Sequence, residues 1–151
     1  MADAFIKYEV FKDELMKGNH GNFSTPNTLK VVLSNTAGDV VPALATPTLT
    51  DVTQITGGGT TGYTAGGASA TAAYGYSGGT VTISGTAITW TAGADGMGPF
   101  QHSILYNDTH SSDGLIGAWT RAAGAVTLTN GETFTLKFNS LTGSQTMFTV
   151  A

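Results

Sequence analysis

The sequence predicts a mainly β protein, an antiparallel β-sandwich or jelly roll with one short N-terminal helix. Apolar and polar residues alternate over most of the chain beyond residue 28, and turns rich in glycine, proline and asparagine separate the alternating runs. Helical spacing of apolar residues is confined to the first 18 residues. Alternation puts every second side chain on one face of a strand, and about eight to ten short strands joined by turns are typical of sandwiches and jelly rolls.

The chain is expected to form a single domain. Its 151 residues suffice to bury a hydrophobic core without disulfides or metal ions. We assign residues 1–18 to an N-terminal helix or arm and residues 28–151 to the β-sandwich.

The N-terminal segment has the spacing of an amphipathic helix. Phe5, Tyr8, Phe11 and Leu15 recur every three or four residues, and Gly18 follows at the position of a helix C-cap. Such an apolar stripe either closes one end of the domain or forms an arm that docks on another subunit.

The first strand is predicted from residue 28 to residue 34, with Leu29, Val31 and Leu33 on one face. Residues 35–50 are expected to be a connection or an edge strand, because proline cannot donate to a central ladder. Residues 51–55 are ambiguous between a weak capping box, formed by Asp51 and Gln54, and extended backbone. Further alternating runs predict strands at residues 69–76, 100–106, 115–120 and 145–150.

Two hairpins are predicted from turn residues. The first turns at Gly85 and Thr86, because glycine at the first loop position suits a type II′ turn, and it pairs Val81 and Ile83 with Trp90 and Ile88. The second turns at Asn130 and Gly131 through a bulged three-residue loop, and it pairs Val126 and Leu128 with Leu136 and Phe134.

Composition excludes several functions. Charged residues make up 11% of the chain, the net charge is −4, and the six Lys and Arg residues form no basic patch, so direct nucleic-acid binding is not expected. The lack of cysteine excludes a disulfide framework and thiol catalysis and fits synthesis in a reducing cytoplasm. Charges interrupt the apolar residues of the first 20 positions, so neither a signal peptide nor a membrane span is expected.

A glycine motif typical of dinucleotide binding occurs at Gly57, Gly59 and Gly62. Its chemistry requires a strand that feeds a helix, whose N-terminus holds a pyrophosphate. No helical pattern follows these glycines, so dinucleotide binding is not predicted.

The motif G-x-S-x-G of α/β-hydrolases occurs at Gly75, Ser77 and Gly79, and Asp95 and His102 follow in the order of a catalytic triad. A nucleophile elbow needs a strand-to-helix turn, whereas an alternating strand follows Ser77 at once. We interpret Ser77 as a turn residue between two strands and predict that the protein is not an enzyme; a small esterase that uses Ser77 is the alternative.

No metal or cofactor site is predicted. The histidines, His20, His102 and His110, lack the spacing of zinc ligands. The loop carboxylates lack the spacing of an EF-hand; they are Asp95, Asp108 and Asp113. We interpret His102 as a core histidine whose hydrogen bonds are satisfied, and His110 as part of a solvated turn.

The order of segments resembles that of small virion structural proteins of tailed bacteriophages, a group that includes capsid decoration, or cement, proteins. The resemblance lies in the N-terminal helix and the successive segments TLKVVLSNT, TGYTAGG, ITWTA, GPFQHSILYNDT, LIGAW and VTLTNGETFTLKFN. It implies a protein made in the host cytoplasm that binds the outside of the phage head and stabilises contacts between capsid subunits. The implied partners are the major capsid protein and further copies of this chain, as a homotrimer. No functional residue transfers from the resemblance.

The candidate interface lies on the N-terminal helix and on the glycine-rich segment 57–76, because both are apolar and carry few charges. It comprises Phe5, Tyr8, Phe11, Tyr63, Tyr74 and Tyr76. The alternative function is a phage tail or fibre component that binds host polysaccharide through Tyr63, Tyr74, Tyr76 or Trp119.

Overall fold

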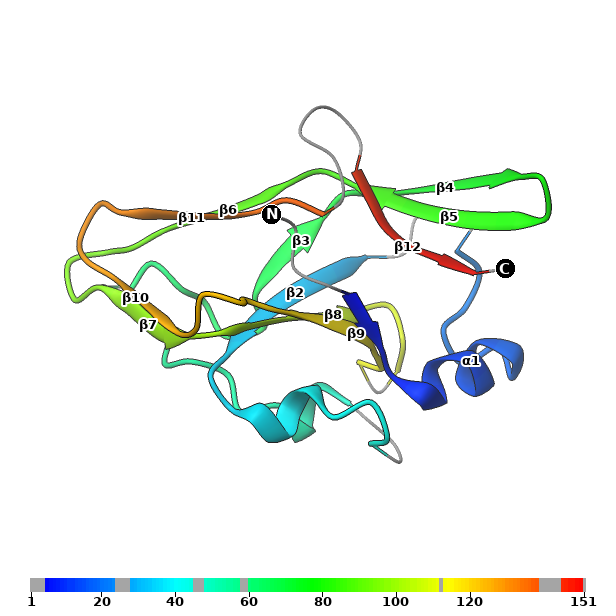
Figure 1. The fold of residues 1–151 in the computed structure, drawn as a ribbon, viewed down its shortest axis with the longest axis horizontal. Helices are drawn as coiled ribbons and strands as arrows, with labels where there is room; N and C mark the ends of the chain where they lie inside the picture. The colour runs from blue at the N-terminus through cyan, green and yellow to red at the C-terminus, as the bar shows by residue number, and fades with distance from the viewer. Residues whose placement is uncertain are drawn as a thin grey trace.

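The protein folds as a β-sandwich-like arrangement of antiparallel sheets with one short α-helix, as Figure 1 shows for the computed structural model, and the predicted fold class is confirmed. The structure describes residues 5–23, 28–44, 48–57, 60–111, 113–138 and 145–150. Within this part of the chain, no helix has the length and apolar character needed to span a bilayer.

One layer is a five-stranded sheet, extended on one side by a two-stranded ladder (Figure 1). The sheet has the order β1-β9-β8-β2-β3, with bounds Phe5–Lys7, Leu115–Thr120, His102–Asn107, Leu29–Ser34 and Ala68–Ala70. The ladder pairs β7 with β10, whose bounds are Met97–Phe100 and Val126–Leu128. Because β7 runs into β8 with only Gln101 between them, the ladder continues the line of the sheet.

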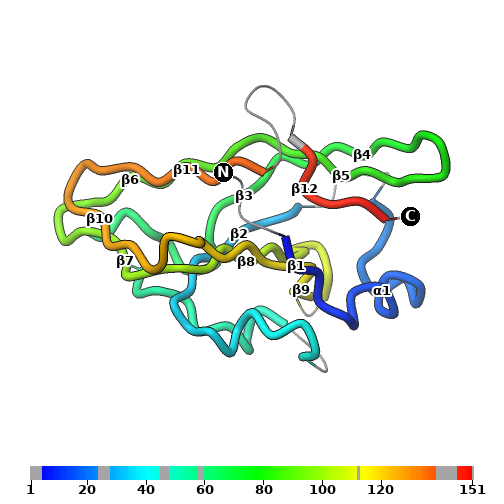
Figure 2. The backbone as a smooth tube through the Cα atoms, viewed as in Figure 1, coloured from blue at the N-terminus to red at the C-terminus, as the bar shows by residue number. Residues whose placement is uncertain are grey.

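The other layer consists of two smaller sheets that lie end to end (Figures 1 and 2). The three-stranded sheet has the order β12-β5-β4, with bounds Gln145–Val150, Thr80–Gly85 and Ala72–Ser77. The two-stranded sheet pairs β11 with β6, at Thr133–Leu136 and Ile88–Thr91. The tube in Figure 2 shows that β5 passes directly into β6, so one extended run of chain serves both sheets.

The five-stranded sheet separates two hydrophobic cores, because its interior strand β2, between β8 and β3, carries buried side chains on both faces. Leu29, Val31 and Leu33 belong to the large core between the layers. Val32 belongs to a smaller core with Tyr8, Ile104 and Tyr106 on the opposite face. That face is covered by the connection between β2 and β3, which contains two 3₁₀ turns, η1 at Ala37–Val40 and η2 at Leu49–Asp51.

The N-terminal segment is part of the domain, and its helix is shorter than the spacing predicted. Phe5 lies in β1, which pairs with β9, and the helix α1 covers only Glu9–Met16. Gly18, with φ +79°, ends it in a Schellman motif, because the Gly18 N–H donates to Leu15 and the Asn19 N–H donates to Glu14. The predicted cap at Gly18 is confirmed, and the described residues 5–18 do not form an arm.

The prediction of a hairpin at Gly85 and Thr86 is wrong. Gly85 lacks the positive φ of a type II′ turn, and the chain continues from β5 into β6 without reversing. A side chain at Gly85 would be crowded, since its Cβ would lie 3.0 Å from the Thr71 carbonyl oxygen and would displace the terminal methyl of Met147. The true hairpin joins β4 to β5 through Gly78 and Gly79, whose positive φ angles of 57° and 83° suit a type I′ turn.

The second predicted hairpin is also wrong in its pairing, although its turn exists. Glu132 donates its N–H to the Thr129 carbonyl, and Gly131 has a φ of +83°. The flanking strands belong to different layers, because β10 pairs with β7 and β11 pairs with β6. The turn therefore crosses between the layers instead of closing a ladder.

Other local predictions are confirmed in part. The predicted strands 69–76 and 100–106 are each divided, at Thr71 between β3 and β4 and at Gln101 between β7 and β8. Strands occupy residues 115–120 and 145–150, and residues 35–44 and 48–50 form a connection. The ambiguous Asp51 belongs to a capping box with Thr48, and not with Gln54. Trp90 is a core residue that is 5% exposed.

Candidate functional site

The structure places the six candidate interface residues in different environments. Tyr8, Phe11 and Tyr63 are buried within the chain, which corrects their assignment to an interface, because the apolar stripe of the N-terminal segment packs on its own domain. Phe5 is half-buried. Tyr74 and Tyr76 are 45% and 67% exposed and can meet a partner.

The buried tyrosines use their hydroxyl groups inside the fold. Tyr8 Oη donates to the Asp39 carbonyl at 2.5 Å, and burial together with the Asp39 charge raises its pKa far above the usual range. Tyr63 Oη donates to Gln54 Oε1 at 2.9 Å and accepts from the Leu33 N–H at 3.3 Å. Burial raises the pKa of Tyr63 to about 12. Both tyrosines stabilise the fold.

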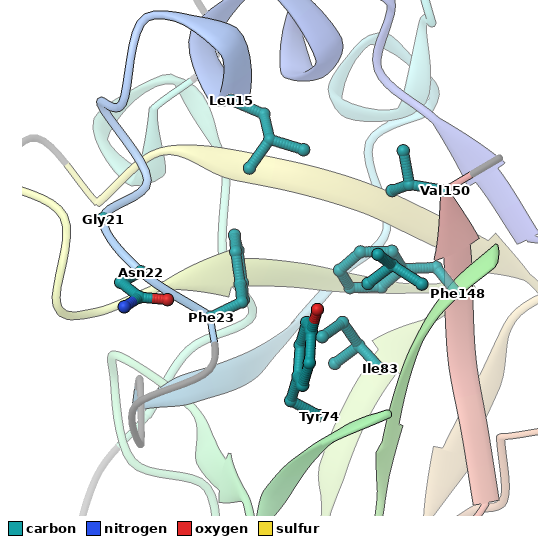
Figure 3. A pocket seen from close by; sticks show the side chains of 9 residues that line it. Leu15, Gly21, Asn22, Phe23, Tyr74, Ile83, Phe148 and Val150 are labelled. Carbon is teal, nitrogen blue, oxygen red and sulfur yellow. The ribbon is translucent and has the colours of Figure 1, made fainter. Parts of the chain in front are cut away.

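An apolar cavity of about 300 Å³ lies between α1 and the three-stranded sheet. In Figure 3, Leu15 reaches toward it from α1, Tyr74 and Ile83 from the β4–β5 hairpin, and Phe148 from β12. No side chain that lines the cavity is charged; the lining consists of Leu15, Gly21, Asn22, Phe23, Tyr74, Val81, Ile83, Phe148 and Val150.

The register of the three strands explains this apolar lining. Tyr74 pairs with Ile83, and Ile83 pairs with Phe148, so these side chains form one row across β4, β5 and β12. A second row, nearer the hairpin turn, is formed in the same way by Tyr76, Val81 and Val150. Because side chains alternate between the two faces of a sheet, both rows lie on the face toward the cavity.

The helix and the loop after it cover the first row. Phe11 packs edge-on against Phe148, with 5.5 Å between the ring centroids, and Phe23 packs against Phe148 at 6.2 Å. The second row ends at the exposed ring of Tyr76. We call Leu15, Phe23 and the two rows the apolar cleft.

The two segments proposed for the interface thus meet in space. Leu15 from the N-terminal helix and Tyr74 from the glycine-rich segment line the same cavity. Sequence reasoning missed Phe23, Ile83 and Phe148. Alternation predicts that the apolar side chains of residues 80–85 share one face, and likewise those of residues 145–150. No signal in the sequence near either segment shows that β12 lies beside β5.

The two enzyme motifs lack the structural context that their chemistry needs. Ser77 is the last residue of β4 and is followed by the Gly78–Gly79 turn, so it is a turn serine between two strands, as predicted. After Gly57 the described chain forms turns up to β3, with no helix, and Gly59 lies outside the described residues. The absence of enzymatic activity stays a prediction.

The histidines occupy structural positions. His102 is buried, as predicted, with Nδ1 2.9 Å from Thr120 Oγ1, and burial lowers its pKa. The prediction that its hydrogen bonds are satisfied is wrong for Nε2, which is buried without a partner among the described residues. His110 lies in a turn, as predicted, but its ring also contacts that of buried His20, with 5.0 Å between the centroids. Burial, and then the neighbouring His110, lower the pKa of His20 to about 4.

Two of the three loop carboxylates have separate side-chain partners. Asp108 forms an ion pair of 2.9 Å with Lys30, and Asp95 accepts a hydrogen bond from Thr60. Among the described residues, no three histidine or acidic side chains are grouped so that they could hold a metal ion.

No family model, curated protein or solved structure matches this chain. The assignment of a function therefore depends on the chain's own residues, and the apolar cleft is the surface feature with the clearest capacity to bind.

Proposed function

We propose that the protein is a virion structural protein of the capsid decoration type, which binds the outside of a tailed-phage head and stabilises contacts between capsid subunits. It would be made in the host cytoplasm and then join the particle. The observation that carries the proposal is the uncharged apolar cleft between α1 and the β4–β5 hairpin, with Tyr74 and Tyr76 exposed at the hairpin.

The cleft has the properties of a protein-binding surface. Strong interfaces are built around an apolar or aromatic anchor that fills a pocket on the other protein. A cavity of about 300 Å³ without a charged lining residue suits such an anchor, here a large apolar side chain of the major capsid protein. Exposed tyrosines beside it supply contact area at a low cost in side-chain entropy.

The low charge of the chain suits a protein that is repeated many times on a shell. With 11% charged residues, copies and shell subunits can lie close together without strong repulsion. A protein that touches several capsid subunits gains avidity, because each further contact forms within one complex.

The proposal is tested by adding the purified protein to phage shells that lack it and measuring the bound copies per shell by quantitative mass spectrometry. We expect hundreds of copies of the wild-type chain and strongly reduced binding of Tyr74→Ser. Val41→Ser is the matched control, because Val41 is as exposed as Tyr74, at 45%, and does not line the cavity. Its neighbours Val40 and Leu44 pack on the smaller core, not on the core beside the cleft. Equal binding of both variants would contradict the role of the cleft, and no binding of the wild type would contradict the decoration role.

A tail or fibre component that binds host polysaccharide is the second candidate. It is favoured by the two exposed tyrosines on one face of β4, since aromatic faces stack on the apolar faces of sugar rings. Tyr63 and Trp119 are excluded as sugar-binding residues, because both are buried. Two results together would support this candidate over the decoration role. The protein would bind to a glycan array and lose this binding in Tyr76→Ser, and each particle would contain a few tens of copies of the protein or fewer.

A further inference from the structure

Strand β4 forms one edge of the three-stranded sheet. The order β12-β5-β4 leaves its outer side without a neighbouring strand among the described residues. The β4–β5 hairpin also extends beyond the rest of the layer in Figure 1, which leaves this edge accessible.

The turn determines which backbone groups point outward. The two-residue loop Gly78–Gly79 makes Ser77 and Thr80 a hydrogen-bonded pair. Pairs along an antiparallel ladder alternate between bonded and non-bonded. Tyr74 and Tyr76 therefore direct their N–H and C=O groups away from β5, whereas Gly75 between them bonds to β5.

In the described part of the chain, the hairpin that forms this edge has no charged residue, proline or bulge to prevent pairing with another strand. Natural edges are protected by charged residues, proline or bulges. Neither β4 (AAYGYS) nor β5 (TVTISG) contains a charge or a proline, and their register runs without a shift from Ala72 to Ser77.

The edge is also self-complementary, because Tyr74, Gly75 and Tyr76 read the same in both directions. We propose that two copies of the chain pair antiparallel along β4, about a two-fold axis that passes between their Gly75 residues. Tyr74 of one copy then lies opposite Tyr76 of the second copy, and each such pair exchanges two main-chain hydrogen bonds. Gly75 lies opposite Gly75 in the non-bonded position, where the two backbones approach most closely.

This register joins the apolar rows of the two copies. The row of Phe148, Ile83 and Tyr74 in one copy continues into Tyr76, Val81 and Val150 of the second copy. A six-stranded sheet results, with two unbroken apolar rows on one face. The axis is perpendicular to the sheet, so both clefts open on the same side.

A second copy fits this edge better than an unrelated strand does. Any extended peptide could use the outward N–H and C=O groups, but only a palindromic partner matches tyrosine to tyrosine and glycine to glycine in the same register. The uncharged hairpin introduces no like-charge repulsion at the two-fold contact, although the whole chain has a net charge of −4.

A cysteine at position 75 tests the pairing directly, because the natural chain has no cysteine. A Cβ at Gly75 meets nothing closer than the Thr82 carbonyl oxygen at 3.8 Å, so Gly75→Cys fits the hairpin. Two cysteines in facing non-bonded positions lie within the range of a disulfide. Ser77→Cys is the control, because Ser77 would face Ala73 of the second copy and not itself.

We expect the full-length wild-type chain to sediment as a dimer, and Gly75→Cys to form a disulfide-linked dimer at least about tenfold faster than Ser77→Cys under mild oxidation. A wild-type monomer or trimer would overturn the proposal, the trimer being the form expected from the sequence. Equal cross-linking rates of the two variants would also overturn it, even if a dimer were found.

The facing residues give a second test of the register. Tyr74→Lys combined with Tyr76→Glu introduces two opposite-charge pairs across the axis, so this double variant should sediment as a dimer. Tyr74→Lys combined with Tyr76→Lys should sediment as a monomer with an unchanged circular dichroism spectrum. The same oligomeric state for both variants would contradict the register. These measurements use no phage shells, so their outcome is separate from that of the proposed decoration role.

Discussion

The ring of Phe5 packs against the ring of Trp119 on the neighbouring strand, with 4.6 Å between the two centroids. This contact ties the edge strand of the five-stranded sheet, β1, to its neighbour β9. It makes the N-terminal segment part of the domain.

We therefore expect Phe5→Ala to lower the free energy of unfolding by about 2 kcal/mol, less than for a fully buried phenylalanine because the side chain is half-buried. Urea denaturation followed by tryptophan fluorescence measures this loss. Met16→Ala is the control, since Met16 is 86% exposed and its removal should change stability by less than about 0.5 kcal/mol. If Phe5→Ala has no larger effect than Met16→Ala, β1 contributes nothing to stability.

Trp90 should be among the most costly core residues to remove. Its ring stacks on Phe134 of the paired strand, with 5.8 Å between centroids. Trp90→Ala is expected to cost about 3 to 5 kcal/mol, because it removes a large apolar side chain and leaves a cavity. Calorimetry of this variant beside Tyr76→Ala measures the difference; similar melting temperatures would show that Trp90 is not a core residue.

The buried carboxylate of Asp39 should stabilise the connection that covers the smaller core. It accepts hydrogen bonds from Ser34 Oγ at 2.5 Å and from the Thr53 N–H at 3.0 Å. Asp39→Ala leaves these donors without their acceptor and should cost about 2 to 3 kcal/mol. Asp13→Ala on the exposed side of α1 serves as the comparison in the same denaturation series. Equal stability of the two variants would contradict this role.

Stability should depend on pH through His20. Its pKa is about 4 in the folded chain and about 6.5 when unperturbed. Between these values the unfolded chain binds a proton that the folded chain does not, so the free energy of unfolding falls as the pH falls from 6.5 toward 4. The slope is at most about 1.4 kcal/mol per pH unit.

The variant His20→Phe isolates this contribution, because the pKa of His102 is also lowered and acts in the same direction. A phenyl ring can pack against Phe11 in place of the imidazole. Urea midpoints at pH 7 and pH 5 should differ less in the variant than in the wild type. The same difference in both proteins would show that His20 does not titrate in this way.

Much of the fold follows from local pattern. Alternation located β2, β9 and β12, and Gly18 marked the end of the helix, because these signals depend on residues near each other in the chain. Both predicted hairpins failed for the opposite reason. After Gly85 the strand β6 pairs with the distant β11, while β5 pairs with β4 through the preceding turn. On either side of Asn130 and Gly131, β10 and β11 pair with β7 and β6, and neither turn reveals these partners.

The candidate site was predictable only in part, for the same reason. Tyr74 and Tyr76 were identified because their segment is apolar and uncharged. The buried Tyr63 shares that description, and only the fold distinguishes it from them. The cavity walls come from α1, β5 and β12 together, and a cavity between distant segments has no local signature.

The direct passage of β5 into β6 has a mechanical consequence. A force applied at the Gly78–Gly79 turn is transmitted along one extended stretch of backbone, from the tip of the hairpin to the ladder of β6 with β11 at the far end of the layer. Because the strands lie along the direction of pull, their hydrogen bonds are loaded in shear and resist together, instead of opening one after another. Strain at the hairpin tip is therefore transmitted through this layer across the length of the molecule.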